Sequence, residues 1–138
     1  MTAKARRDKK SSTGGVDATL VRHGGLSYLE IPAADARRSA SFYQKVLGWN
    51  LTGGDTDRPK FQDQTGHLIG RWVTGRPIPR EPGLVPYFYV DHIDEVVKRV
   101  QANAGKVIEG PRPEGILSVA SVRDPAGNVI GLWEEADT

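Results

Sequence analysis

The sequence predicts an α+β fold made of two βαβββ modules that pack as a pseudo-symmetric pair, and three observations lead to this prediction. DQTGHLIGRW (63–72) and DPAGNVIGLW (124–133) share Asp, Gly, Ile, Gly and Trp in one frame, 61 residues apart. Before each phrase, a short apolar strand that opens with Tyr is followed by an amphipathic helix that ends at Gly (28–48 and 87–105). The 16 Gly and 9 Pro lie between short apolar runs, which indicates many short strands joined by turns.

The N-terminal segment 1–22 is predicted to be a flexible basic tail ahead of a single domain, 23–138. It carries six of the 19 basic residues but only two of the 17 acidic ones, so 23–138 holds 13 basic and 15 acidic residues, a net charge of −2. No aromatic residue interleaves the tail's charges for base stacking, and we therefore expect no nucleic-acid partner. The ATLV run at 18–21 is compatible with one more short strand.

Module one is expected to span 26–74. The apolar stripe of its helix is formed by Ala36, Ala40, Tyr43 and Leu47, with Phe42 and Val46 beside it. Gly48 ends the helix, and strands are expected near 49–53, 59–63 and 67–74. The four prolines of TGRPIPREPGLVP (74–86) then predict a stiff, extended linker, bounded here at 75–83.

Module two is expected to span 84–135. Its helix carries a single apolar stripe, formed by Ile93, Val96, Val97, Val100 and Ala104. Asp91 is the expected N-cap and Gly105 the expected left-handed residue after the helix. Strands are expected near 106–109, 116–122 and 128–134, and DPAG fits a type I turn followed by a left-handed Gly that joins the last two.

The composition also excludes several classes of protein. There is no long apolar run, so we expect no membrane span, and no apolar stretch follows the basic start as in a secretory signal. Cysteine is absent, which removes disulfides, thiolate nucleophiles and Cys-ligated zinc. A cytoplasmic location is the resulting expectation.

Three phrases resemble the vicinal oxygen chelate superfamily, the group of glyoxalases, bleomycin-resistance proteins and extradiol dioxygenases. They are EIPAADARRSASFYQKVLGW, YVDHIDEVVKRVQANAGKVI and DPAGNVIGLWE. The resemblance implies that the two modules form a curved mixed sheet around a cleft and that the protein is a homodimer, as many members are. It also implies, for enzymatic members, a divalent metal held by four side chains from the first and last strands of each module.

The positions that match those metal ligands depart from the family pattern. They fall on Tyr28, Gly70, Val85 and Gly131. Val and Gly have no side-chain donor, and a neutral tyrosine is a poor ligand for a divalent cation. The three histidines (His23, His67 and His92) form no HxH, HxxxH or HxxE pair. We therefore predict no metal and no cofactor, unless a divalent metal site is rebuilt elsewhere.

Strand alternation then assigns side chains to the cleft. The predicted ligand-binding set is Tyr28, Glu30, Gly70, Trp72, Val85, Tyr87, Tyr89, Gly131 and Trp133. The opposite face, which meets the helices, is expected to be Leu29, Ile31, Phe88, Val90, Ile130 and Leu132. In this interpretation the two glycines leave space in the cleft and the two tryptophans form its walls. Arg71, Arg76 and the loop 109–115 would border the cleft, where an arginine could bind an anionic group of the ligand. The competing interpretation is that these aromatic residues are ordinary core.

Three functions remain open on this basis. The first is a metal-free protein that binds a small aromatic or amphipathic molecule, as bleomycin-resistance members do. The alternative is a lyase, isomerase or dioxygenase with a non-standard site, in which Glu30 acts as base if burial raises its pKa and Tyr28 or Tyr87 donates a hydrogen bond. The third is an interaction module that works through its basic tail. No Walker loop, dinucleotide fingerprint or nucleophile elbow is present.

Overall fold

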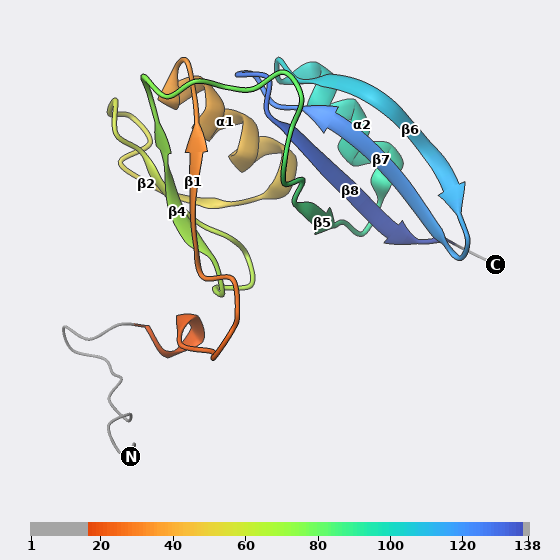
Figure 1. Ribbon diagram of the computed structural model, residues 1–138, viewed down its shortest axis with the longest axis horizontal. Helices are drawn as coiled ribbons and strands as arrows, with labels where there is room; N and C mark the ends of the chain where they lie inside the picture. The colour runs from red at the N-terminus through yellow and green to blue at the C-terminus, as the bar shows by residue number, and fades with distance from the viewer. Residues whose placement is uncertain (1–16, 137–138) are drawn as a thin grey trace.

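The computed structural model describes residues 17–136, and the expectation for residues 1–16 of the tail lies outside this range. The first module runs β1 (Tyr28–Pro32), α1 (Ala36–Leu47), β2 (Asn50–Thr52), β3 (Lys60–Gln62) and β4 (Ile69–Val73). The second runs β5 (Tyr87–Tyr89), α2 (Ile93–Ala102), β6 (Lys106–Glu114), β7 (Leu117–Arg123) and β8 (Val129–Glu135). The predicted α+β fold of two βαβββ modules is confirmed (Figure 1).

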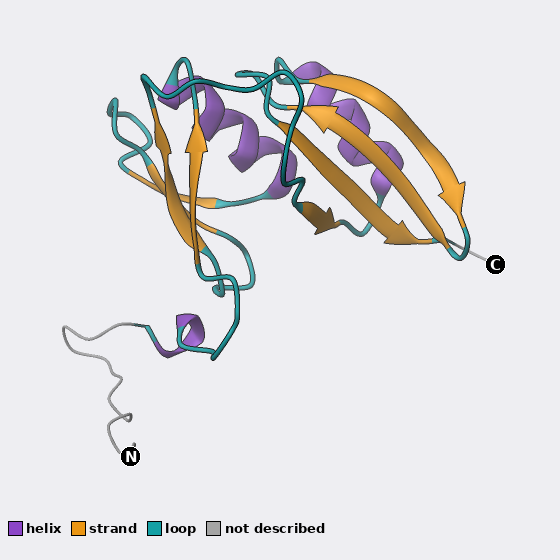
Figure 2. Ribbon diagram, in the orientation of Figure 1, coloured by secondary structure: helices purple, strands orange, loops and turns teal. Residues whose placement is uncertain are grey.

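Each module forms its own four-stranded mixed sheet. The strand orders are β1-β4-β3-β2 and β5-β8-β7-β6, and in each sheet the first strand pairs in parallel with the last while the other pairs are antiparallel. The two sheets do not join into one, and both helices lie on the side where the modules meet (Figure 2). The opening strands β1 and β5 are therefore edge strands, each with one unpaired side.

Helix α1 ends at Gly48, as its sequence predicts, and begins after a capping aspartate. The side chain of Asp35 accepts a hydrogen bond from the backbone N–H of Arg38, and Gly48 takes the left-handed conformation with φ +73°. Its buried side includes Phe42 and Tyr43, which continue into an aromatic core with Trp49, Phe61 and Trp72.

Helix α2 has the predicted stripe but different ends. Asp91 is not its cap: His92 precedes the helix without a side-chain bond, and a carboxylate from β8, that of Glu134, accepts the Ile93 N–H instead. At the other end Ala104, not Gly105, is left-handed (φ +72°). Gly105 is needed because a Cβ there would overlap Phe42, Val100 and a backbone oxygen of β7.

Two local expectations were wrong. The segment 109–115, expected to be a loop, lies almost wholly in β6 because it pairs with β7 along nine residues interrupted by register shifts. The run 18–21 adds no strand: Ala18–Leu20 forms one turn of 3-10 helix capped by Asp17, and the Thr19 hydroxyl donates to the carbonyl of Gly66 in the first repeated turn. No helix in the described part of the chain is both long and apolar enough to cross a bilayer.

Both repeated phrases form the predicted hairpin turns. In each, the glycine N–H donates to the aspartate carbonyl three residues earlier, at 3.1 Å for Gly66 and 2.9 Å for Gly127. The second turn also fastens the modules together, because the side-chain N–H of Asn128 donates to the carbonyl of Pro32 at the end of β1 (2.7 Å).

Candidate functional site

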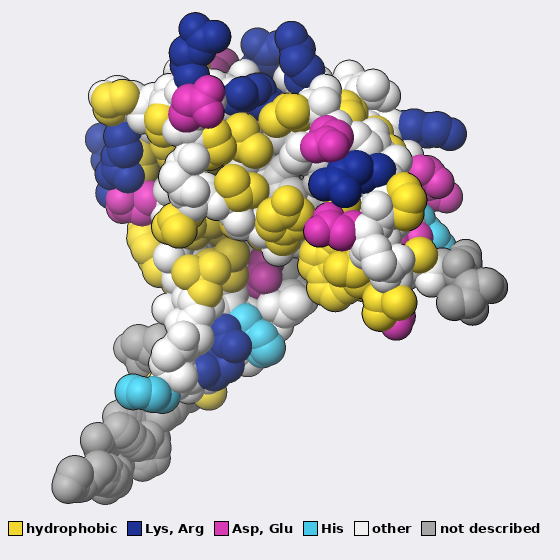
Figure 3. All heavy atoms as spheres, turned by 45° about the vertical axis from the view of Figure 1, so that its right-hand side comes forward, with side chains coloured by type: hydrophobic (Ala, Val, Ile, Leu, Met, Phe, Trp, Pro, Cys, Tyr) yellow, Lys and Arg dark blue, Asp and Glu magenta, His cyan; other side chains and the backbone are white. Residues whose placement is uncertain are grey.

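The outer face of the second sheet, which we define as the face turned away from α2, carries the predicted aromatic residues of module two. Register pairs Tyr87 with Gly131 and Tyr89 with Trp133, so all four lie on this face. The rings of Tyr89 and Trp133 meet edge to face with centroids 5.0 Å apart. Both tyrosines are 55% exposed, and Figure 3 shows hydrophobic side chains on the surface beside charged ones.

The glycine on this face does not leave an empty space. A Cβ at Gly131 would coincide with the ring of Tyr87, so the ring lies directly over the bare backbone. The structure therefore corrects the expectation that Gly131 opens room for a ligand: the neighbouring aromatic side chain fills that room. The result is a flat aromatic surface formed by Tyr87, Tyr89 and Trp133.

In the first sheet, the side chains of β4 were predicted to point to the wrong face of the sheet. The parallel register pairs Leu29 with Gly70 and Ile31 with Trp72, so Gly70 and Trp72 face the helix. Trp72 is 5% exposed and packs against Phe61 (4.9 Å between centroids) in the core. A Cβ at Gly70 would overlap the Phe61 ring and the Leu29 carbonyl. Neither residue belongs to a cleft wall.

One difference between the two repeated phrases indicates that their strands have opposite orientations. The residue between Gly and Trp is Arg71 in the first phrase and Leu132 in the second. An arginine is far costlier to bury than a leucine, so Arg71 must point outward and its neighbours inward. The same alternation applied to Leu132 gives the opposite orientation, which is the one observed.

The outer face of the first sheet is polar. Tyr28, Glu30 and Arg71 lie on it, and Glu30 accepts hydrogen bonds from Arg76 (2.9 Å) and Arg71 (3.0 Å). These two arginines, Arg76 first, hold the pKa of Glu30 below its usual value. The condition under which Glu30 could act as a general base, a pKa raised by burial, is not met, because Glu30 is paired with cations.

These residues do not fit a divalent metal. The first and last strands of the two modules present Tyr28, Glu30 and Arg71 on one sheet and Tyr87 and Gly131 on the other. Within 17–136, no three His, Asp or Glu side chains come together as a metal site would require. His23, His67 and His92 are all exposed and far apart in the chain.

The two outer faces do not oppose each other within one chain. The first sheet is seen nearly edge-on in Figure 1, whereas the second shows its broad face in the same view. Tyr28 and Trp133 are thus not two walls of one cleft within a single chain. Val85 lies just before β5 in the linker and is half-buried.

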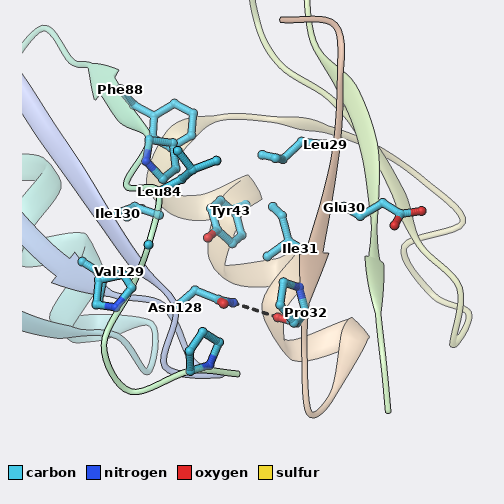
Figure 4. Close-up of a pocket in the computed structure, with 14 residues that line it drawn as sticks. Leu29, Glu30, Ile31, Pro32, Tyr43, Leu84, Phe88, Asn128, Val129 and Ile130 are labelled. Carbon is cyan, nitrogen blue, oxygen red and sulfur yellow. Dashed lines mark hydrogen bonds between the residues drawn. The ribbon is translucent and has the colours of Figure 1, made fainter. Parts of the chain in front are cut away.

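Between the modules lies a cavity of about 300 Å³ that sequence reasoning missed (Figure 4). It separates β1 from β5 and the start of β8, with one ring from α1, and the linker 74–86 crosses it. The side chains that point into it are Leu29, Ile31, Tyr43, Leu84, Phe88 and Ile130. Five of these, all but Leu84, were expected only as core, because alternation shows which face a side chain takes but not where two packed modules leave a gap.

A second hollow, of about 550 Å³, lies between the end of α1, the first repeated turn, β5 and α2. Tyr87 and Tyr89 line it, and so do charged groups that include Lys45, Glu95 and Arg99. The predicted tyrosines of β5 thus stand at the border between the aromatic outer face and a polar groove.

Comparison with known proteins gives consistent matches. Residues 25–132 match the family model described as the Glyoxalase/Bleomycin resistance protein/Dioxygenase superfamily. A glyoxylase-like domain-containing protein of Didymella fabae is 33% identical over 95 residues, which cover 63% of this chain and 73% of that protein. The anthracycline biosynthesis protein DnrV of Streptomyces peucetius is 27% identical over 131 residues; these cover 81% of this chain but 47% of DnrV, so the chain spans about half of that relative.

Solved structures share the fold at low identity. A glyoxalase/bleomycin resistance protein/dioxygenase family enzyme from Burkholderia phytofirmans PsJN superposes with a TM-score of 0.64 at 20% identity, covering 81% of this chain and 99% of that one. TnmS3, an antibiotic-binding protein from Streptomyces sp. CB03234, superposes with a TM-score of 0.61 at 23% identity, covering 82% and 97%.

Proposed function

Since the chain belongs to the glyoxalase/bleomycin resistance protein/dioxygenase superfamily, we propose that it is a cytoplasmic protein that binds a small aromatic or amphipathic molecule without a metal ion. The observation that carries this proposal is the aromatic outer face of the second sheet. There Tyr87, Tyr89 and Trp133 stand together, and both tyrosines are more than half exposed.

Physical chemistry favours a planar ligand on this face. Exposed aromatic side chains that are already held by a sheet lose little conformational entropy on binding. Each stacked or edge-to-face ring contact adds about 0.5–1.5 kcal/mol beyond the area that it buries. The antibiotic-binding description of TnmS3 and the anthracycline pathway named for DnrV are in keeping with such a ligand.

A homodimer is part of the proposal. One chain offers only one wall, because its outer faces diverge (Figure 1). A second copy related by a two-fold axis would set the polar first sheet of one chain, with Tyr28 and Arg71, opposite the aromatic second sheet of the other. The cleft then has an aromatic wall and a wall with hydrogen-bond donors. Sedimentation of the full chain tests this, and a monomer that keeps full ligand affinity contradicts it.

Ligand binding is tested by titrating the full chain with an anthracycline and following tryptophan fluorescence. We expect quenching in the natural protein and loss of most of the response in Trp133→Phe, since Trp49 and Trp72 are buried in the core. EDTA should leave the titration unchanged. Ile116→Ala, an exposed change in the turn between β6 and β7, is the control. A titration that needs added divalent metal overturns the metal-free part of the proposal.

A further inference from the structure

The cavity between the modules has the features of a binding site separate from the aromatic face. It lies on the helix side of both sheets, whereas Tyr87, Tyr89 and Trp133 lie on the outer side of the second. Its volume of about 300 Å³ is at the lower end of the range of small-molecule pockets. The buried side chains of Ile31, Tyr43 and Ile130 form its floor, so the cavity reaches into the core between the modules.

The lining defines the kind of molecule that fits. The carboxylate of Glu30 points away from the cavity and is held by Arg71 and Arg76 (Figure 4). The Tyr43 hydroxyl already donates to Asp124 (2.8 Å), and the Asn128 side chain already donates to Pro32 and Asp124. A charged or strongly polar occupant would lose its hydration without finding partners.

The linker holds the cavity open. Pro79, Pro82 and Pro86 border the space, and their fixed φ angles keep this segment arched instead of collapsing inward. Its two ends are fastened: Arg76 pairs with Glu30 on β1, and the Pro86 carbonyl accepts a hydrogen bond from Gly131 (2.8 Å). Between them Leu84 borders the cavity and is 95% exposed, so the cavity is open to solvent on this side.

We propose that the inter-module cavity is a second ligand site, which takes a compact, uncharged, hydrocarbon-rich molecule about the size of two fused rings and admits it through its open side beside Leu84. The site goes beyond the proposed function because it uses none of the aromatic outer face. Leu29 and Ile31 from β1, with Phe88 and Ile130 from the second module, form its walls.

The test is a fluorescence titration of the full chain with naphthalene, an uncharged probe of two fused rings. We expect saturable 1:1 binding. Leu29→Trp fills the cavity and should weaken binding at least about tenfold. Leu29→Ala enlarges the cavity and should preserve or tighten binding. The matched control is Leu26→Trp, the same change at a position that is 62% exposed and outside the cavity, which should leave binding unchanged.

Two precautions keep the result decisive. If Leu29→Trp does not fold by circular dichroism, Leu29→Phe adds less volume and should weaken binding in the same direction. Probe binding that is unchanged in the filled variants, or that Trp133→Ala abolishes, overturns the cavity site. The second of these outcomes would place the probe on the aromatic face and leave the proposed function intact. If the natural protein binds the probe but gives no response to the anthracycline, the proposed function is overturned and the cavity site is left intact.

Discussion

The hydroxyl of Tyr43 on α1 donates a 2.8 Å hydrogen bond to the carboxylate of Asp124, in the hairpin turn between β7 and β8, 81 residues later. Both residues are buried. The other oxygen of the same carboxylate accepts the backbone N–H groups of Ala126, Gly127 and Asn128, so one side chain shapes the turn and holds the other module. This pair connects the repeated phrase to the packing of the two halves.

Removal of this hydrogen bond should destabilise the protein without changing the hairpin turn between β7 and β8. Tyr43→Phe keeps the ring in the core but removes one of the two donors to a buried oxygen of Asp124, so that only the side-chain amide of Asn128 still donates to it. We expect a loss of about 1–3 kcal/mol in the free energy of unfolding, measured by urea denaturation. Tyr28→Phe, on the exposed outer face of the first sheet, should change stability by less than about 0.5 kcal/mol. Equal effects of the two changes would contradict this role for the pair.

The same hydroxyl predicts sensitivity to alkaline pH. Burial, and then the negative charge of Asp124, raises the pKa of Tyr43 well above its ordinary value of 10.0. The unfolded chain loses this proton near its ordinary pKa while the folded chain keeps it, so the stabilisation is complete below pH 10 and falls as the pH rises above it. The free energy of unfolding should decline more steeply above pH 10 in the natural protein than in Tyr43→Phe. Parallel curves for the two proteins would show that Tyr43 does not contribute.

Much of the fold could be predicted because both modules repeat the same signals. The turns, the stripe of α2 and the linker follow from Gly, Pro and apolar spacing, which act locally. The orientation of β4 was predicted wrongly because the first phrase was aligned with the second through Gly and Trp, and the charge of Arg71 was given too little weight. The ends of α2 depended on contacts made by Glu134 and Phe42, which are distant in sequence and leave no local pattern.

For the candidate site, the alternation of side chains along a strand correctly predicted the aromatic outer face of the second sheet. It did not predict the cavity between the two modules. The positions of Tyr87, Tyr89 and Trp133 follow from the period of two in a strand. The cavity beneath the linker depends on the distance between β1 and β5, which packing of α1 on α2 sets and no strand pattern encodes.

The two tryptophans of the repeated phrases should differ sharply in their contribution to stability. Trp72 is buried among Tyr43, Trp49 and Phe61, so Trp72→Ala should cost about 3–5 kcal/mol of unfolding free energy. Trp133 is half-buried on the outer face beside Tyr89, so Trp133→Ala should cost clearly less but remove the ligand response. Denaturation of the two variants side by side checks this, and the reverse order of stability would mean that β4 has the orientation first predicted.

The two glycines of the repeated phrases offer the complementary test, because different atoms occupy the space beside them. A Cβ at Gly70 would meet the backbone carbonyl of Leu29, which cannot move without breaking the pairing of β1 with β4. The three atoms nearest to a Cβ at Gly131 all belong to the ring of Tyr87, an exposed side chain that can rotate away.

We therefore expect Gly70→Ala to destabilise the chain by several times as much as Gly131→Ala, about 3 kcal/mol against 1 kcal/mol or less, in urea denaturation. Gly131→Ala should instead weaken binding on the aromatic face, because it displaces one of its three rings. In a Tyr87→Ala background, the added methyl group should have no further effect on stability or binding, since the clash is gone. An undiminished effect of Gly131→Ala in that background would show that the ring of Tyr87 does not lie over Gly131.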